Sequence, residues 1–219
     1  MLNGWGEMIA AFALFFLSHS IPVRPAIKQR ITGLIGKRGF TLAYSALSIA
    51  VLAWIIAAAG RAPHVELWPW APWQNMVPIV AMALAFTITA LSLGRPNPLS
   101  FGGLNNERFD PAHPGLIGWI RHPLLFALLL WALAHLVPNG DLAHVILFGL
   151  FAGFALLGMK IVDRRKQRLL GAQEWQRLAS ARREIRPTPG GLLRLALGLL
   201  AYAALLHAHQ WLFGVSPLT

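Results

Sequence analysis

The sequence predicts an all-α integral membrane protein, a single bundle of about six transmembrane helices, on three observations. Of the 219 residues, 56% are hydrophobic and only 12% are charged, which is about half the charged fraction of an average soluble domain. The apolar residues fall in long runs, and the basic residues fall in the loops between them. Short segments of alternating polarity, which are typical of a membrane β-barrel, are absent. This composition excludes an ordinary soluble enzyme, a disordered chain and, since there is no cysteine, a disulfide-stabilised secreted domain.

Each predicted span is a mostly apolar run close to the length of about 20 residues that crosses a bilayer as a helix. Glu7 and Arg121 lie near span ends, where long side chains reach the headgroups. The first run lacks the basic flank and cleavage site of a signal peptide, so we expect it to be a span. No internal repeat or linker divides the chain, so we expect one domain over residues 1–219. The predicted spans are residues 5–21, 40–59, 76–93, 117–137, 142–161 and 192–213.

The basic residues predict the orientation of the bundle. Three alternate loops, 21–39, 94–121 and 160–191, hold 17 of the 19 Lys and Arg residues. Cytoplasmic loops are enriched in Lys and Arg, so we expect these loops in the cytoplasm and both termini outside. Leucines and a tryptophan are interspersed in the basic segment 160–187, which indicates an amphipathic helix on anionic lipid. Too few aromatic residues accompany these charges for stacking of bases, so we expect no nucleic-acid partner.

Histidine is the main candidate for chemistry, because the chain has eight histidines and no cysteine. An ionisable residue inside a span is costly to bury and is a functional candidate by default. His19, His122 and His135 are the main candidates. His64 and His113 lie in loops, and His144, His207 and His209 lie in predicted spans near the outer interface. A buried histidine can simply hydrogen-bond to a neighbouring helix. Two histidines that face one cavity can instead bind haem b as its axial ligands. A covalently attached c-type haem is excluded, because the chain has no CxxCH motif.

Several segments that follow one another in order resemble the NnrU family. The match covers about residues 10–187 and leaves the last predicted helix outside it. Its motifs are SHS at 18–20, GKRGF at 36–40, Tyr44-Ser45, GLIGWIRHPLL at 115–125, WALAH at 131–135, NGD at 139–141 and Gly158 followed by DRR at 163–165.

This resemblance implies a multi-pass protein of the bacterial inner membrane. Bacterial members are associated with denitrification, where they are linked to nitrite and nitric oxide reductase expression. The plant and cyanobacterial branch includes 15-cis-ζ-carotene isomerase, a membrane haem b enzyme with histidine ligands. By motif, its ligands fall on His19 and His135, while Ala132 replaces a cysteine of that branch. Without that cysteine, a redox-linked switch to thiolate ligation is impossible here.

The family resemblance therefore predicts a haem b-binding protein that acts in redox chemistry, nitric oxide sensing or isomerisation. Denitrification or electron-transfer components are its expected partners. Arg121 or Arg38 would pair with the haem propionates through bidentate bonds. His122 would be a supporting donor or an alternative ligand. Two ligands of one haem must lie at the same depth in the membrane. Counted along the helix from the nearest basic residue, His135 lies deeper than His19, so ligation by His19 and His122 is an open alternative.

Two other functions also stay open. Isoprenylcysteine methyltransferases similarly place an RHP motif at the start of a span and a basic segment after the next, which would assign an S-adenosylmethionine site to Arg121, His122 and residues 160–187. Their paired glutamates are missing here, where Asp163-Arg164-Arg165-Lys166 stands instead. The third possibility is a non-catalytic membrane scaffold that assembles another complex. The sequence leaves open whether the protein is an enzyme.

Overall fold

The computed structural model describes residues 5–218 and is helical throughout its regular structure. No strand occurs in this part of the chain, where Glu66 and Asp141 form one isolated β-bridge. The α-helices are α1 (Trp5–Ser20), α2 (Pro25–Arg61), α3 (Met76–Ser92), α4 (Pro123–Leu136), α5 (Leu142–Leu170), α6 (Ala172–Ala179) and α7 (Pro189–Phe213). Three short 3-10 helices are η1 (Pro72–Asn75), η2 (Asn106–Arg108) and η3 (Gly115–Gly118).

Four helical segments of the described chain are long and apolar enough to cross a membrane. They are α2, the continuous stretch of η1 and α3, α5 and α7. The remaining two expected spans correspond to α1 and α4, which have 16 and 14 residues and are shorter than the usual span of about 20 residues. The all-helical membrane class is thus confirmed. The number of six spans and the orientation of the termini stay predictions.

The helix α2 contains a break that separates a basic segment from the span predicted at 40–59. Gly36 has φ 73° and ψ 167°, a backbone conformation that is essentially restricted to glycine. The helical hydrogen-bond pattern resumes directly after it, so a short helix precedes the apolar one. Arg24 is the N-cap of the first part, which contains Lys28 and Arg30, whereas Lys37 and Arg38 open the second part.

The fourth span begins later than the sequence predicts. Residues 117–122 were expected to be part of it, but α4 begins only at Pro123. Proline has no backbone N–H and disfavours helical geometry at the residue before it, so it is well suited to a first helical position. His122, with φ −116° and ψ 67°, is the N-cap and lies outside the helix.

The segment 160–187 was expected to be one amphipathic helix, which is wrong. The helix α5 continues to Leu170, and Gly171, at φ 79°, ends it before α6. After α6, residues 181–188 have no helical structure. Glycine adopts such a positive φ without steric cost, and the break at Gly171 together with the end of α6 divides the basic segment into three pieces.

The chain forms two compact units, and each is described by itself. The first comprises residues 5–68 and 140–147, in which α1 packs along α2. Glu7 joins the two helices, since it accepts hydrogen bonds from Trp54 Nε1 at 2.9 Å and Arg61 Nε at 3.1 Å. Gly140 lies against Trp68 so closely that a Cβ there would be 2.1 Å from the Trp68 carbonyl oxygen.

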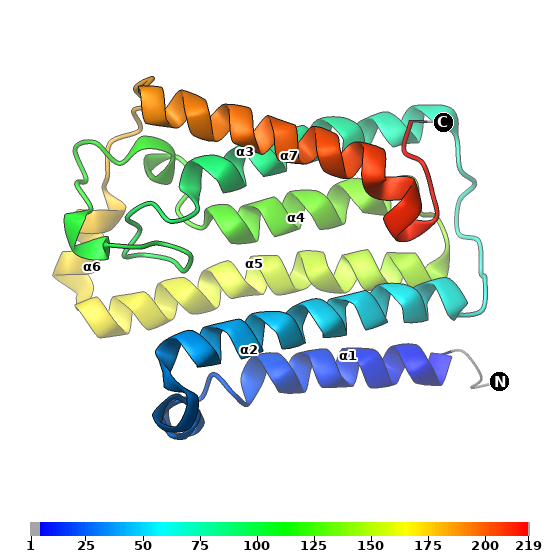
Figure 1. Cartoon of the computed structure of the whole chain (residues 1–219), viewed down its shortest axis with the longest axis horizontal. Helices are drawn as coiled ribbons and strands as arrows, with labels where there is room; N and C mark the ends of the chain where they lie inside the picture. Colours follow the sequence, from blue (N-terminus) through cyan, green and yellow to red (C-terminus); the bar gives the residue numbers. More distant parts are fainter. Residues whose placement is uncertain (1–4, 219) are drawn as a thin grey trace. The chain divides into compact units, whose positions relative to one another are not determined.

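The second unit comprises residues 69–139 and 148–218, and in it α3 packs against both α4 and α7 (Figure 1). Tyr202 on α7 donates to the carbonyl oxygen of Ile79 on α3 at 2.9 Å. Trp131 on α4 makes edge contacts with Phe148 and Phe151 on α5. The loop between α3 and α4 lies at the same end of this unit as α6 (Figure 1).

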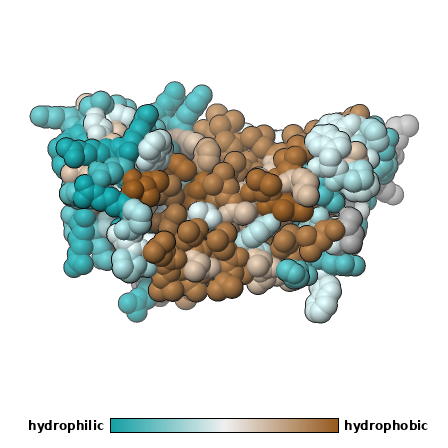
Figure 2. Space-filling model, turned by 90° about the horizontal axis from the view of Figure 1, so that it is seen from above, coloured by the Kyte–Doolittle hydropathy of each residue, from teal (hydrophilic) through white to brown (hydrophobic). Residues whose placement is uncertain are grey.

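Large apolar side chains cover the outer surface of α7 in the second unit. Leu193 and Leu200, for example, are 62% and 66% exposed. Figure 2, which looks onto the face formed by α7 and α3, shows apolar residues gathered across the middle and hydrophilic residues toward both ends. An exposed apolar band of this kind is expected for helices in contact with lipid tails.

Candidate functional site

His135 lies in the last turn of α4 with one ring nitrogen fixed by its own helix. Its Nδ1 is 2.9 Å from the Trp131 carbonyl oxygen. A carbonyl oxygen only accepts, so Nδ1 carries the proton and Nε2 of the neutral ring holds a lone pair. No partner lies within hydrogen-bond distance of this Nε2 in the part of the chain that the structure describes. The rings of Trp131 and Phe148 flank the imidazole, each with a centroid distance of 5.6 Å.

His19, near the end of α1, has the same local arrangement. Its Nδ1 lies 2.9 Å from the carbonyl oxygen of Phe15, so here too Nδ1 carries the proton. The Nε2 atom is 3.5 Å from the hydroxyl oxygen of Ser48 on α2, and that hydroxyl donates at 2.9 Å to the Tyr44 carbonyl. The half-buried imidazole packs on the ring of Phe15.

The two histidines belong to different units of the chain. His19 lies in the first and His135 in the second, so their joint ligation of iron stays a prediction. No group of three or more His, Cys, Asp or Glu side chains with metal-binding geometry occurs among residues 5–218. A bis-histidine haem site needs only two protein ligands.

Arg121, His122 and Asp163 form the most connected polar cluster of the second unit. His122 Nε2 donates to Asp163 Oδ1 at 3.0 Å, and Arg121 Nη1 donates to Asp163 Oδ2 at 2.8 Å. His122 Nδ1 lies 3.0 Å from the hydroxyl oxygen of Ser100. Because a carboxylate accepts through Nε2–H, the neutral ring leaves Nδ1 to accept from the Ser100 hydroxyl. Both ring nitrogens are therefore engaged within the protein, and His122 is only 6% exposed.

Two further side chains hold Arg121 in place. Asn97 is 2% exposed, and its Nδ2 donates to the Arg121 carbonyl oxygen at 3.0 Å. The Arg121 guanidinium lies over the Trp175 ring of α6, 5.0 Å from its centroid. A guanidinium stacked on an aromatic face gains a cation–π attraction in addition to its ion pair. The cluster thus ties together the α3–α4 loop, α5 and α6.

Asp163, Ser100 and Asn97 were not predicted from the sequence as members of this cluster. The Asp163 side chain is only 29% exposed. One signal was present, since Asp163 is the only acidic residue within the basic stretch 160–168. Asn97 lies between two prolines, but nothing local indicates its partner 24 residues away.

The remaining candidates and histidines are not members of this cluster. Arg38 is exposed on α2 in the first unit, so its expected pairing with a haem propionate stays a prediction. His113 pairs with Asp110 at 2.7 Å, and His144 pairs with Asp141. His207 on α7 also directs Nδ1 to the carbonyl four residues earlier, 2.8 Å away. This orientation of the ring is therefore not confined to the two proposed ligands.

Comparison with known proteins supplies the family. The family model described as NnrU protein matches residues 7–217, nearly the whole chain. No curated protein and no solved structure matches it. The match includes His19, Arg121, His122 and His135, and it extends through the last helix, which the motifs alone did not reach. The resemblance seen in the sequence is confirmed, and the chain belongs to the NnrU protein family.

Proposed function

We propose that this protein is a haem b-binding membrane protein with His19 and His135 as its iron ligands. The observation that carries the proposal is the hydrogen bonding of the His135 imidazole. Its Nδ1–H donates to the Trp131 carbonyl oxygen, which leaves the lone pair of Nε2 for a metal ion. Histidines that bind metal almost always donate their other ring N–H to a carbonyl or carboxylate. The structure holds the imidazole in the tautomer and orientation that such a ligand requires.

The surroundings of His135 fit a buried cofactor. Trp131 and Phe148 pack against the half-buried ring of His135. Asn139 donates to the His135 carbonyl oxygen at 2.7 Å and so holds the end of α4. When bound, haem b supplies one-electron redox chemistry. The chain's own residues orient the ligand.

His122 fits the role of a positioning group better than that of a ligand. Its two ring nitrogens already bond to Asp163 and Ser100, and iron ligation would have to break one of these hydrogen bonds. Arg121 is likewise paired with Asp163. Only its remaining N–H groups are left for a propionate, since the guanidinium has five donors. The favoured pair is therefore His19 and His135.

The proposal extends to the biological setting. We place the protein in the bacterial inner membrane, in the reduction of nitrite and nitric oxide during denitrification. Its NnrU family membership supports this.

The test is an absorption spectrum of the full chain, purified in detergent from haem-replete cells and recorded oxidised and dithionite-reduced. We expect a Soret band, with sharp α and β bands on reduction. The His135→Ala variant should lose this band. His207→Ala is the matched control, because it removes a histidine with the same carbonyl hydrogen bond from another helix. A featureless spectrum of folded wild-type protein, or an unchanged haem content in His135→Ala, contradicts the proposal.

A further inference from the structure

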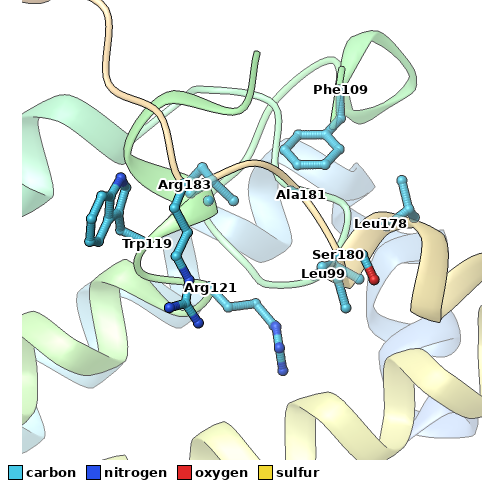
Figure 3. Close-up of a pocket in the computed structure, with 11 residues that line it drawn as sticks. Leu99, Phe109, Trp119, Arg121, Leu178, Ser180, Ala181 and Arg183 are labelled. Atoms are coloured by element: carbon cyan, nitrogen blue, oxygen red, sulfur yellow. The ribbon is translucent and has the colours of Figure 1, made fainter. Parts of the chain in front are cut away.

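A cavity of about 270 Å³ lies between the α3–α4 loop, the end of α6 and the segment after it. It belongs entirely to the second unit. In Figure 3, Arg121, Arg183 and Trp119 lie on one side of the cavity, and Phe109 and Leu178 lie on the other. Two cationic side chains therefore lie on one side of the cavity, and two apolar side chains lie on the other.

Two walls of the cavity, the α3–α4 loop and residues 181–183, are in direct contact with each other. A Cβ on Gly118 would lie 2.0 Å from the carbonyl oxygen of Arg182, so only glycine permits this approach of the two segments. The backbone N–H of Arg182 donates to the Pro111 carbonyl at 2.9 Å. Residues 181–183 are thus fixed to the α3–α4 loop on both sides, and this holds the Arg183 backbone at the cavity.

The cationic side carries positive charge that the cavity wall does not balance. No lining residue is acidic. Asp163 neutralises Arg121 from outside the cavity, whereas Arg183 has no ion-pair partner among the residues that the structure describes. The nearby Glu184 is paired with Arg186. An anion is the ligand that would complete this arrangement.

Three apolar residues of the cavity lining are themselves well buried. Leu99, Ile117 and Leu178 are 2%, 6% and 5% exposed. Trp119, at the cationic side, is 58% exposed, as is typical of an aromatic residue at a membrane interface. The accessible lining of the cavity is more polar than apolar, which suits an anionic group at the cationic side.

We propose that this cavity binds a phosphate group, held between the guanidinium groups of Arg121 and Arg183. Arginine binds phosphate oxygens through two parallel N–H donors, which makes it the preferred residue for such sites. The volume is slightly below the range of about 300–1,000 Å³ typical of small-molecule pockets, so it suits a phosphate headgroup better than a whole nucleoside cofactor. The phosphate is either a lipid phosphomonoester or free phosphate. The assignment does not depend on haem.

The test is calorimetric titration of the full chain in detergent with two probes, inorganic phosphate and dihexanoyl phosphatidic acid. The informative variant is Arg183→Gln, because Arg183 is exposed and makes no ion pair whose loss would disturb the fold. Loss of a charged hydrogen-bond donor should weaken binding by about tenfold or more.

Arg182→Gln is the matched control, with the same loss of charge one residue away and outside the cavity wall. Arg182 already faces carboxylates. The pKa of Asp110 is lowered by its hydrogen bond with His113, by that with the Ala112 N–H and, to a smaller extent, by the charges of His113 and Arg182. We expect this control to change the affinity by less than about threefold.

The outcomes separate the sources of phosphate. Equal affinities for the two probes indicate free phosphate, and a lipid affinity about tenfold higher indicates a headgroup. The proposal fails if neither probe binds, or if the two variants lose equal affinity. It also fails if Arg183→Gln lowers the haem content, because the cavity would then hold a propionate. An absent Soret band with intact phosphate binding contradicts only the proposed haem function.

Discussion

The imidazole Nε2 of His122 lies 3.0 Å from Oδ1 of Asp163, although 41 residues separate the two in the sequence. The contact joins the N-cap of α4 to the basic part of α5 within the second unit. The second oxygen of the same carboxylate binds Arg121. One partly buried acid thus accepts hydrogen bonds from two neighbouring basic residues of the motif RHP and fixes how α4 begins.

The Asp163→Asn variant should destabilise the protein by about 1–2 kcal/mol, since an amide keeps the shape but loses the charge that Arg121 faces. The measurement is the free energy of unfolding of the full chain in detergent. Glu174→Gln is the control, because it neutralises an exposed carboxylate that pairs with Arg177 on α6. We expect no measurable change there. Equal effects of the two substitutions would show that the Asp163 cluster adds nothing to stability.

The sequence was sufficient for those features that depend on local composition. Runs such as 76–93 and 142–161 predicted α3 and most of α5, because length and hydropathy decide whether a segment forms a membrane helix. Boundaries depended on single residues with special backbone geometry. Gly36 interrupts α2 and Pro123 delays α4, and neither effect appears in an average over a window.

The partners of the candidate residues could not be predicted in the same way. The sequence identified Arg121 and His122 through their motif but gave no indication that Asp163 and Ser100 bond to them. Such contacts depend on how distant helices pack, and periodicity within one helix carries no information about that. For the same reason, the cavity between the α3–α4 loop and residues 178–183 emerged only from the structure.

Gly118→Ala should be poorly tolerated. Its new Cβ would lie 2.0 Å from the Arg182 carbonyl oxygen, and the obstacle is backbone that has to shift. Overpacking of this kind costs about 1–3 kcal/mol. Gly149→Ala on α5 is the matched control, because no atom lies within 4 Å of the Cβ position there. Alanine favours a helix, so this control should be neutral or slightly stabilising. Similar unfolding free energies for the two variants would contradict the close approach.

Single introduced cysteines should determine the orientation, because the chain has no cysteine of its own. We expect a membrane-impermeant maleimide to label Pro63→Cys, between α2 and η1, in intact cells. Arg168→Cys, in the basic segment, should react only after the cells are permeabilised. Labelling of Arg168→Cys in intact cells would reverse the predicted orientation. Pro63 and Arg168 are both solvent-accessible, so reactivity of both after permeabilisation is the internal control.

The choice between the two histidine pairs can be made with variants at His122 and His135. We expect His122→Gln to keep the Soret band, because both nitrogens of His122 bond within the protein and glutamine retains polar atoms for Ser100 and Asp163. His135→Ala and His19→Ala should each lose the band. Haem content is compared per mole of monodisperse protein, which separates loss of a ligand from loss of folded protein. If His122→Gln abolishes the band and His135→Ala leaves it intact, iron is held by His19 and His122, and the hydrogen bonds of His122 must rearrange on haem binding.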